Sequence, residues 1–498
     1  MKTLESILQG LPCDLAGSAA VPISDIVFDS RKVKPGALFV ALKGARQDGH
    51  NHIASAVQAG AKAVMVERDV PAPGVSRVRV PDTLKALAHI SIRFWDNPSR
   101  RLRMIGITGT NGKTTTSYLI ESIFTAAGWS TGVMGTINYR FQTNVIPAPN
   151  TTPFASEVQR FLASVLEKGG QACVMEVSSH ALKLGRVEGV EFDVAVFTNL
   201  TQDHLDFHQS MDAYAAAKAK LFEGIDPSSG KPFPRAVVLN ATDPWSEKMA
   251  ARARVPVLRY RINGSGSPGS RPVELLAKNV TCDATGSRFD LCSPASRQAV
   301  RLQLLGEYNV MNALAAAGAA TCQGVPLTTI VRGLEAVSGV PGRMERIASP
   351  RGFTVVIDYA HTEDALRQVM TALRKLKPTR LVTVFGCGGD RDRTKRPLMG
   401  EAAAQMSDEV VVTSDNPRSE QPAKIALDVE VGVRRVRSDH YSIVLDREEA
   451  IAKALSIAQP GDIVLIAGKG HENYQIMADH TIPFDDREVA RRLMEAKP

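Results

Sequence analysis

The sequence predicts an α/β protein of three domains. Its 498 residues are too many for one hydrophobic core, since single cores stop growing at about 250–300 residues. From Leu102 onward, apolar strand-like runs alternate with helical segments, and a second alternation of the same kind starts after Gly342. We therefore expect domains at residues 1–98, 99–337 and 338–498.

The N-terminal domain is expected to be a small α/β unit. Strand-like runs occupy Ala37 to Leu42 and Ala63 to Val66, and the amphipathic stretch from Thr83 to Trp95 predicts a helix. Asn97-Pro98 marks the exit, because the residue before a proline disfavours the helical conformation.

The other two domains carry apolar runs typical of buried parallel strands. In the central domain they are Met104 to Thr108, Cys173 to Val177, Val194 to Thr198 and Ala236 to Leu239. A turn-rich loop at Asn263 to Arg271, short strands within Val273 to Leu304 and an alanine-rich helix from about Val310 are expected to follow. The C-terminal domain is expected to be Rossmann-like, with strands Thr354 to Asp358, Leu381 to Phe385, Val410 to Thr413 and Ile463 to Ala467.

A phosphate-binding loop follows the first strand of the central domain. Ile105 to Thr116 reads Ile-Gly-Ile-Thr-Gly-Thr-Asn-Gly-Lys-Thr-Thr-Thr. The loop amides and the helix N-terminus concentrate positive potential, Lys113 adds a full charge, and the Thr114 hydroxyl can ligate Mg²⁺. The sequence therefore predicts a central domain of P-loop type that binds Mg-ATP.

The match to the general P-loop pattern is incomplete. That pattern places a glycine five residues before Gly112, where this chain has Ile107. A purely structural glycine turn is the alternative, but the order of strand, turn, Lys-Thr and helix favours a nucleotide site.

Composition narrows the class of protein. Hydrophobic residues make up 44% and charged residues 22%, which is typical of a soluble globular chain. No apolar run approaches the roughly 18 residues of a membrane span, and the first ten residues lack the order of a secretion signal. The six cysteines form no Cys-x-x-Cys pair. We expect a cytoplasmic protein with reduced thiols, no membrane span and, by default, a monomer.

The net charge of +8 does not indicate nucleic-acid binding. The basic residues are scattered, and the clusters near Arg100 and Arg434 lack interleaved aromatic residues. An anionic small substrate explains the positive balance equally well.

Polar residues follow the predicted strands of the central domain. Glu176 ends one strand and His204 follows another, and in parallel sheets ligands gather at the carboxyl ends of strands. A carboxylate and an imidazole beside a phosphate loop suit Mg²⁺ coordination. A satisfied structural role is the alternative for either residue taken alone.

In the C-terminal domain, charged residues follow the strands in the same way. Arg391 and Arg418 can each offer a planar fork to a carboxylate, and Glu472 can receive an ammonium group. Together these groups predict a receptor for a zwitterion. Helix capping and loop salt bridges are the alternative, chiefly for Asp390, Asp392 and Arg393.

These motifs, taken in order, resemble the Mur ligases of peptidoglycan synthesis over nearly the whole chain. The resemblance is carried by Gly-Thr-Asn-Gly-Lys-Thr-Thr, Glu176, His204, Pro341-Gly342-Arg343-Met344-Glu345, Asp-Tyr-Ala-His and Gly-Lys-Gly-His-Glu. Asp415-Asn416-Pro417-Arg418 is similar to the signature of members that add meso-2,6-diaminopimelate rather than lysine.

The resemblance implies an ATP-dependent amide ligase. ATP would phosphorylate the terminal carboxylate of UDP-N-acetylmuramoyl-L-alanyl-D-glutamate, and the amine of diaminopimelate would attack the acyl phosphate to give an amide, ADP and phosphate. Mg²⁺ and Lys113 would neutralise the accumulating charge.

The resemblance also assigns roles to positions of this chain. The catalytic positions are Lys113, Glu176, His204 and Lys218, and the metal ligands are Thr114, Glu176, His204 and Lys218 as a CO₂-derived carbamate. ATP would contact Gly109, Thr110, Asn111, Gly112, Lys113, Thr114, Thr115, Asn309, Arg343, Asp358 and His361. The UDP substrate would contact Ser30, Asn150, Thr151, Thr152, Ser178 and Arg186. Diaminopimelate would contact Arg391, Asp415, Asn416, Pro417, Arg418, Gly468 and Glu472.

Three positions need comment. The sequence around Lys218 alone predicts a solvated helix residue, and only the resemblance makes it a metal ligand. Leu184 stands where the family usually has glutamine, and Glu363 where it commonly has proline. Neither change removes a reacting group.

Two rival classes share the phosphate loop. A folylpolyglutamate-type ligase is expected to lack the Asp-Asn-Pro-Arg and uridine-side features. A nucleotide-gated binding protein would leave Arg391, Arg418 and Glu472 unexplained, and a degenerate ligase would not be expected to retain Lys113, Glu176, His204 and Lys218.

Overall fold

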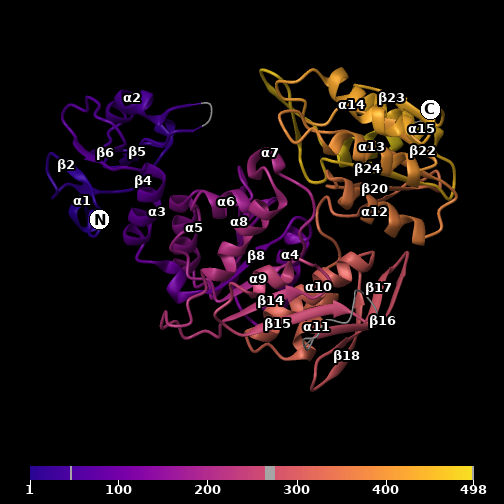
Figure 1. Ribbon diagram of the computed structural model, residues 1–498, viewed down its shortest axis with the longest axis horizontal. Coiled ribbons are helices and arrows are strands. Elements are labelled where there is room, and N and C mark those ends of the chain that lie inside the picture. The colour runs from indigo at the N-terminus through magenta and orange to yellow at the C-terminus, as the bar shows by residue number, and fades with distance from the viewer. Residues whose placement is uncertain (45–46, 264–274, 496–498) are drawn as a thin grey trace. The chain divides into compact units, whose positions relative to one another are not determined.

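The computed structural model describes residues 1–44, 47–263 and 275–495 (Figure 1). The chain forms two compact units. The first contains Met1–Gly106, Trp129–Val194 and Glu223–Arg235, and the second contains Ile107–Gly128, Ala195–Phe222 and Ala236–Pro498. The division into three domains stays a prediction. Of the expected loop at Asn263 to Arg271, all but Asn263 lies outside the described residues.

The N-terminal part of the first unit is built on a five-stranded sheet in the order β2-β7-β6-β5-β4, beside a two-stranded sheet of β1 and β3. Strands β4 to β7 run parallel, and β2 is antiparallel to β7. The elements are β1 (Lys2–Thr3), α1 (Leu4–Leu8), β2 (Asp14–Ala16), β3 (Pro22–Ile23), β4 (Ile26–Val27), η1 (Ser30–Lys32), β5 (Leu38–Val40), η2 (Gly49–His52), α2 (Ile53–Gln58), β6 (Ala63–Val66), β7 (Ser76–Arg79), α3 (Thr83–Phe94) and η3 (Pro98–Arg101). The predicted small α/β arrangement is therefore confirmed.

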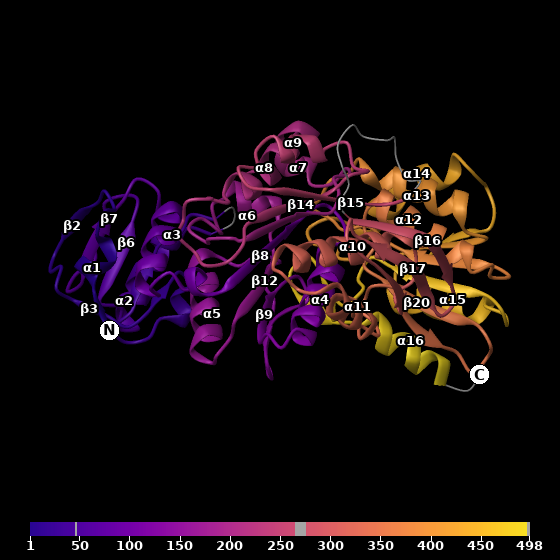
Figure 2. The same ribbon diagram turned by 90° about the horizontal axis from the view of Figure 1, so that it is seen from below.

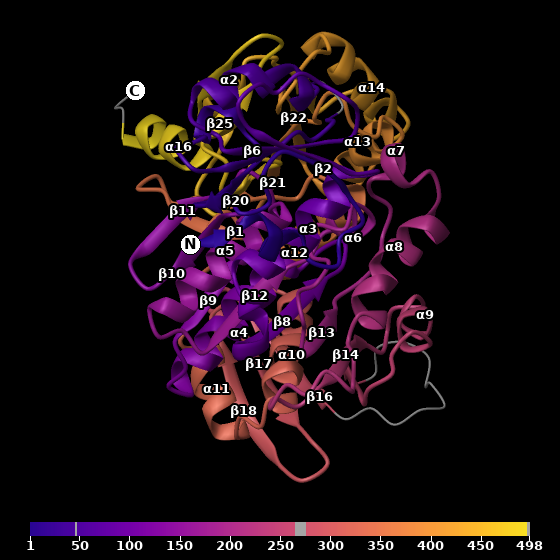
Figure 3. The ribbon, with the colours of Figure 1, turned by 90° about the vertical axis from the view of Figure 1, so that its left-hand side faces the viewer.

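The rest of the first unit contains the strand run β11-β10-β9-β12-β8. Its elements are β8 (Arg103–Thr108), which crosses into the second unit, β9 (Thr131–Met134), β10 (Asn138–Phe141), β11 (Asn144–Pro147), α5 (Ala155–Glu167), β12 (Ala172–Glu176) and α6 (Ser179–Lys183). Helix α5 covers β9, as Figure 3 shows, and Gly132 leaves room for it: an added Cβ would lie 2.8 Å from Val165.

The second unit begins with the helix that follows the phosphate loop and continues through the strand run β13-β14-β15-β16-β17-β18. Strands β14 to β16 are parallel, whereas β16, β17 and β18 are antiparallel, so this sheet is mixed where a parallel one was expected. The elements are α4 (Lys113–Ala126), β13 (Val194–Phe197), α7 (Leu205–His208), α8 (Met211–Glu223), β14 (Ala236–Asn240), α9 (Ser246–Ala250), β15 (Val257–Ile262), β16 (Leu275–Asp283), β17 (Gly286–Cys292), β18 (Arg297–Leu302), α10 (Glu307–Cys322) and α11 (Leu327–Glu335).

The second unit ends in a six-stranded sheet in the order β19-β20-β24-β21-β22-β23, parallel except for β19. The elements are β19 (Glu345–Ala348), β20 (Thr354–Asp358), α12 (Glu363–Lys375), β21 (Leu381–Phe385), α13 (Lys395–Met406), β22 (Glu409–Val412), α14 (Pro422–Arg434), β23 (Tyr441–Ile443), α15 (Arg447–Ile457), β24 (Ile463–Ala467), β25 (Tyr474–Ile476), β26 (Thr481–Pro483) and α16 (Asp486–Glu495). Figure 2 shows α15 and α16 in this C-terminal part.

Alternating side chains bury both faces of this sheet. Val356 and Leu465 pack in one core with α12, α13 and α14, whereas Val355, Val464 and Ile466 pack in another with α15 and α16. Because helices cover both faces, the strands read as continuous apolar runs, and loops at their carboxyl ends are left to carry polar groups.

No helix in the described part of the chain has both the length and the apolar character needed to cross a bilayer.

Candidate active site

The phosphate loop is a tight turn in which two positions require glycine. Gly109 and Gly112 have φ of 153° and 86°. An added Cβ would lie 1.8 Å from Thr198 Oγ1 at Gly109 and 2.3 Å from Asn312 Oδ1 at Gly112. The amide of Thr110 donates to the Asn199 carbonyl at 2.8 Å, which anchors the loop. The backbone can therefore approach a ligand closely at this point.

Lys113 and Thr114 begin helix α4 directly after the loop. The Lys113 ammonium donates to the carbonyls of Gly109 and Thr110, each at 2.9 Å, so its charge lies over the loop. Arg343 Nη2 donates to Thr114 Oγ1 at 3.3 Å. Since the first N–H groups of a 14-residue helix have no acceptor within the helix, this end of α4 fits a polyphosphate.

Lys218 lies on α8 and is only 1% exposed, so the expectation of a solvated residue, drawn from its neighbourhood in sequence, is wrong. Its ammonium nitrogen lies 2.8 Å from the Gly109 carbonyl and 4.5 Å from the centre of the Tyr214 ring. Burial, aided by the charge of Lys113, holds the pKa of Lys218 well below its ordinary value. The neutral amine is the form that can add CO₂.

His204 belongs to a cluster around the buried carboxylate of Asp203. Asp203 Oδ2 lies 3.3 Å from His204 Nε2 and 3.7 Å from His361 Nε2, and Asp203 Oδ1 lies 3.7 Å from Lys395 Nζ. Burial alone would raise the pKa of Asp203, but its hydrogen bond to His361 and the nearby positive charges outweigh burial and hold that pKa well below its ordinary value. His204 itself has a left-handed backbone, with φ of 55°.

Arg343 and Asp358 lie together on the nucleotide side predicted from sequence. The Arg343 guanidinium lies 4.4 Å over the Tyr359 ring. Asp358 accepts from the amides of Met344 and Ala360, both at 2.8 Å. Burial raises the pKa of Asp358, although the charge of Arg343 opposes this.

The remaining nucleotide-side positions are also held by internal hydrogen bonds. Asn309 is buried and donates to the Leu305 carbonyl at 2.8 Å. The Nδ1 atom of His361 lies 2.9 Å from the Tyr359 carbonyl oxygen. Asn111 Nδ2 donates to Asp364 Oδ2 at 3.0 Å, which joins the phosphate loop to the first turn of α12.

Glu176 and all six positions predicted for the UDP substrate belong to the first unit. Thr152 Oγ1 donates to the Glu176 carbonyl at 2.8 Å and accepts from the Ser178 amide at 3.0 Å. Arg186 Nη1 donates to the Thr152 carbonyl at 3.0 Å. The Glu176 carboxylate accepts from the amide and the hydroxyl of Thr136, at 3.0 and 2.9 Å. The structure therefore brings Glu176, Thr152, Ser178 and Arg186 together.

Of the other three positions, Thr151 and Asn150 lie near this group, and Ser30 lies in the N-terminal part of the first unit. Thr151 Oγ1 lies 3.1 Å from Thr136 Oγ1, and the Asn150 carbonyl accepts from the Tyr139 hydroxyl. Ser30 begins η1 in the N-terminal part.

The positions predicted for diaminopimelate follow β22 and β24. Asn416 Nδ2 donates to Glu472 Oε2 at 2.9 Å, and a Cβ at Gly468 would lie 2.5 Å from Asp415 Oδ2. Arg418 Nη1 donates to the Gly389 carbonyl at 2.8 Å. Burial, aided by the charge of Arg391, lowers the pKa of Arg418. Pro417 is buried between Asn416 and Arg418.

The neighbouring charges make hydrogen bonds and ion pairs of the kind that the structural alternative expects. Asp392 accepts from the Thr394 amide at 2.9 Å, Asp390 accepts from the Ser419 hydroxyl at 2.6 Å, and Arg393 pairs with Glu420 at 2.5 Å. Asp390 and Arg393 tie the loop after β21 to the loop after β22, whereas the bond of Asp392 stays within the first of these loops.

Of the two departures from the family pattern, Glu363 has a local explanation and the leucine at position 184 has none. Leu184 is the C-cap residue of α6, and its amide donates to the His180 carbonyl. Glu363 lies in the first turn of α12, where a negative charge stabilises a helix, and it pairs with Arg367.

Four polar residues at the site were not singled out from sequence: Asp203, Tyr359, Lys395 and Lys469. All four stand inside or next to the quoted motifs, so motif membership was the available signal. Their partners are distant in sequence, and only the fold brings them together.

Among the described residues, no three His, Cys, Asp or Glu side chains form a ready metal site. Mg²⁺ does not require such a cluster, because it commonly binds through one or two carboxylates together with substrate phosphates and water.

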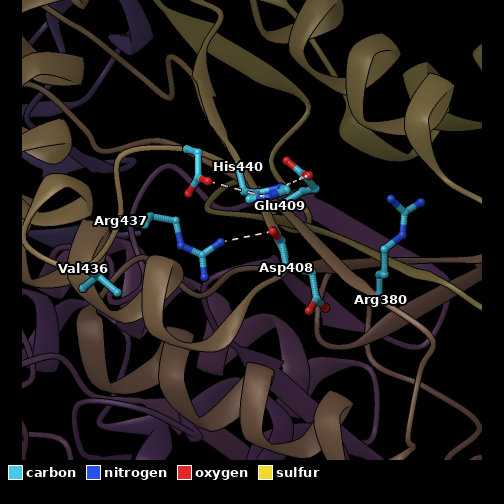
Figure 4. Close-up of a pocket in the computed structure, with 7 residues that line it drawn as sticks. Arg380, Asp408, Glu409, Val436, Arg437 and His440 are labelled. Atoms are coloured by element: carbon cyan, nitrogen blue, oxygen red, sulfur yellow. Dashed lines mark hydrogen bonds and ion pairs between the residues drawn. The ribbon is translucent and has the colours of Figure 1, made fainter.

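A hollow in the C-terminal sheet lies away from these residues (Figure 4). It is lined by Arg380, Asp408, Glu409, Val436, Arg437, Asp439 and His440. Its charges are held by partners inside and outside the hollow: His440 pairs with Glu409 at 2.7 Å, whereas Asp408 pairs with Arg374 at 2.9 Å. None of the predicted site residues lines it.

Comparison with known proteins defines the class. Three family models match: the Mur ligase family catalytic domain over residues 22–95, the Mur ligase middle domain over 107–320, and the Mur ligase glutamate ligase domain over 342–470. The chain belongs to the Mur ligase family.

Individual relatives are similar over almost their whole length. The UDP-N-acetylmuramoyl-L-alanyl-D-glutamate--2,6-diaminopimelate ligase of Solibacter usitatus is 46% identical, covering 97% of this chain and 96% of the relative. A solved structure of an enzyme with that name is 34% identical, with a TM-score of 0.66 and 99% of each chain covered. MurF of Thermotoga maritima in complex with ADP is 20% identical, with a TM-score of 0.66 over 89% of this chain and 93% of that one, and supports the fold alone.

Proposed function

We propose that this protein is an ATP-dependent ligase that joins meso-2,6-diaminopimelate to UDP-N-acetylmuramoyl-L-alanyl-D-glutamate in peptidoglycan synthesis. The relatives at 46% and 34% identity carry the name of this reaction. The observation that carries the proposal is the setting of Arg418: the charges of Arg391, Asp415 and Glu472 all act on its pKa, and a Cβ at Gly388 would lie 2.9 Å from Arg418 Nη1 and 3.8 Å from Arg391 Cγ.

This arrangement suits the distal end of diaminopimelate, which carries both a carboxylate and an ammonium group. Two guanidinium groups favour the carboxylate, and Glu472 favours the ammonium. Lysine has no second carboxylate, so it would leave a partly buried Arg418 unpaired. A lost hydrogen bond to a charged group costs about 1.5 to 3 kcal/mol, which corresponds to roughly tenfold to hundredfold discrimination.

The phosphate loop supplies the chemistry of activation. Mg-ATP, when bound, supplies the phosphoryl group that turns the substrate carboxylate into an acyl phosphate with release of ADP. Attack by the amine then forms the amide, releases phosphate and frees a proton. Lys113 and the N-terminus of α4 hold the phosphates in place, and the tight turn at Gly109 and Gly112 lets the loop amides approach them.

Lys218 is proposed to act as a carbamate that supplies an anionic oxygen to Mg²⁺, with Thr114, Glu176 and His204 as further ligands. The support is its burial and its lowered pKa, since a neutral amine adds CO₂ and releases one proton. Protein prepared with ¹³C-bicarbonate is expected to show a carbamate carbon signal by NMR, and the Lys218→Arg variant is expected to lack it.

The remaining assignments are proposed on the same basis. Thr152, Ser178 and Arg186 bind the muramoyl-peptide part of the UDP substrate, with Ser30 on the uridine side. Asn309, Arg343, Asp358 and His361 bind the nucleotide. We also propose that the protein acts in the cytoplasm, because the reaction uses ATP and a UDP-linked substrate.

Phosphate release tests the proposal. The purified protein is expected to release phosphate only when ATP, Mg²⁺, the UDP dipeptide and diaminopimelate are all present, and removal of Mg²⁺ by EDTA should stop turnover until the ion is restored. A nucleotide-gated binding protein would instead form no ADP with the full set. Release without diaminopimelate would contradict the ligase.

A further inference from the structure

The two loops proposed to bind diaminopimelate come from strands that are not neighbours. Asp415 follows β22 and Gly468 follows β24, and β21 lies between these strands in the sheet. The two strands pair with β21 and not with each other, so a side-chain contact between their ends can add to the spacing that β21 sets.

Arg447, the first residue of α15, makes that contact. Its side chain is completely buried. Nη1 donates to the Ser414 carbonyl at 3.1 Å, and Nη2 donates to the Ala467 carbonyl at 3.0 Å. These carbonyls belong to the residues immediately before Asp415 and Gly468. One rigid guanidinium group thus contacts the ends of both strands.

The buried carboxylate of Asp486 fixes this guanidinium in turn. Arg447 Nε and Nη2 donate to the two oxygens of Asp486, both at 2.8 Å. Burial would lower the pKa of Arg447, but the charge and hydrogen bonds of Asp486 raise it overall, so the group stays protonated. Only a planar fork of five donors can serve both a carboxylate and two separate carbonyls.

Side chains of the two loops also contact one another. Lys469 Nζ lies 3.1 Å from Asn416 Oδ1 and 3.2 Å from Glu472 Oε2. Gln475 Nε2 donates to the Asp415 carbonyl at 2.7 Å. The two loops therefore form one receptor whose base is Arg447.

A buried ion pair is weak evidence for a role in stability, because the cost of desolvation offsets much of the attraction. Resting on the proposed function, we infer that Arg447 is a positioning residue for the amino-acid receptor, which sets the spacing between residues 415–418 and 468–472. It does not touch the substrate.

The same sheet offers a less buried control at the opposite ends of its strands, where the Arg380 side chain is 31% exposed. Arg380 Nη2 donates to Asp462 Oδ2 at 2.7 Å and to the Ile457 carbonyl at 2.8 Å. Arg380 and Asp462 directly precede β21 and β24, Ile457 ends α15, and Arg380 lines the hollow of Figure 4. The Arg380 pair resembles the Arg447 pair chemically but contacts no receptor loop.

The test compares Arg447→Lys with Arg380→Lys. For Arg447→Lys we expect the KM for diaminopimelate to rise tenfold or more, with the KM values for ATP and the UDP dipeptide within twofold of wild type. For Arg380→Lys we expect a lower melting temperature but all three KM values within twofold. Asp486→Asn, which keeps the volume and removes the charge, is the second variant in case Arg447→Lys does not fold, and should shift the same KM in the same direction.

An unchanged KM for diaminopimelate in the folded variant overturns the inference, and so does an equal rise of all three KM values. Failure of the proposed function is distinguishable, because wild type itself would then release no phosphate with diaminopimelate.

Discussion

At the scale of single residues, the proposed function concentrates substrate selectivity in Arg418. It is half-buried, has a left-handed backbone with φ of 53°, and follows directly on Asn416 and Pro417 in the loop after β22. A non-glycine residue in this conformation is uncommon and lowers the stability of the folded state by about 1–3 kcal/mol. Residues with such backbone strain are often found at functional sites.

We predict that Arg418→Met lowers kcat/KM for diaminopimelate by roughly tenfold to a hundredfold, because one charged hydrogen bond to the distal carboxylate is lost. The much lower kcat/KM for lysine should stay within threefold. Arg393→Met, on the neighbouring loop, is the control and should leave both values within twofold. Equal losses with both amino acids would show that Arg418 supports the loop and does not select the substrate.

Glu420 provides a pH-dependent contribution to stability. Its hydrogen bonds to Arg396 and Arg393 lower its pKa from 4.5 to about 2. A carboxylate with a lowered pKa in the folded state stabilises that state above its unfolded pKa, and this contribution is lost as the pH falls toward the folded value. Both arginines approach it from α13 and the segment that precedes this helix.

We therefore predict that the difference in unfolding free energy between wild type and Glu420→Gln is constant above about pH 5 and shrinks between about pH 4.5 and pH 2. Urea denaturation at a series of pH values measures it. Glu401→Gln, which removes a single ion pair to Arg435 at 3.5 Å, is the control and should change stability by less than about 0.5 kcal/mol throughout. A difference for Glu420→Gln that is independent of pH would contradict the assignment.

Some residues of the site could be predicted from the sequence and others could not. Residues inside short motifs, such as Lys113 and Arg418, could be predicted because loop chemistry is local. Lys218 could not be predicted from its surroundings, since nothing near it in the chain shows that α8 buries it against the phosphate loop. Arg447 and Asp203 depend on partners that only the fold brings together.

At the scale of elements, helix α4 connects sequence to function most directly. Glycines stand at both ends: Gly112, with φ of 86°, precedes the first turn, and Gly128, with φ of 82°, follows the last. Their surroundings differ, because a Cβ at Gly112 would lie 2.3 Å from Asn312 Oδ1, whereas a Cβ at Gly128 would meet nothing within 4 Å.

We predict that Gly112→Ala weakens ATP binding at least tenfold, because the added methyl group displaces the loop. Gly128→Ala should leave ATP binding within twofold and cost only the backbone strain of about 1 to 2 kcal/mol. Calorimetric titration with ATP, together with melting temperatures, separates the two effects. Equal affinities in the two variants would show that the loop tolerates displacement.

Strands buried on both faces could be predicted well from sequence. The runs at Thr354 to Asp358, Leu381 to Phe385 and Ile463 to Ala467 match β20, β21 and β24 residue for residue. The alanine-rich helix was expected near Val310 but begins at Glu307, since a weakly amphipathic helix gives no sharp start. The antiparallel strands β16 to β18 fell within a region expected to hold short strands, but their addition to a parallel run could not be read from periodicity.

At the scale of the whole molecule, the second unit joins the nucleotide side to the amino-acid side. Asn111 contacts Asp364, Arg343 contacts Thr114, and Asp203 pairs with Lys395, so the phosphate loop is tied to the C-terminal sheet by polar contacts. Such contacts suit a reaction in which an activated carboxylate has to meet a bound amine.

We predict that an oxygen atom of the substrate carboxylate leaves with the phosphate. If the terminal carboxylate of the UDP dipeptide is labelled with ¹⁸O, one labelled oxygen should appear in each phosphate released, because the acyl phosphate breaks at its carbon–oxygen bond. Mass spectrometry of the phosphate measures this. Unlabelled phosphate would mean that ATP is hydrolysed by water and not by the carboxylate.

The comparison of diaminopimelate with lysine tests the central claim most directly. With ATP, Mg²⁺ and the UDP dipeptide held constant, the account predicts one amide per phosphate released and a kcat/KM for diaminopimelate at least tenfold above that for lysine. Equal values for the two amino acids would contradict it.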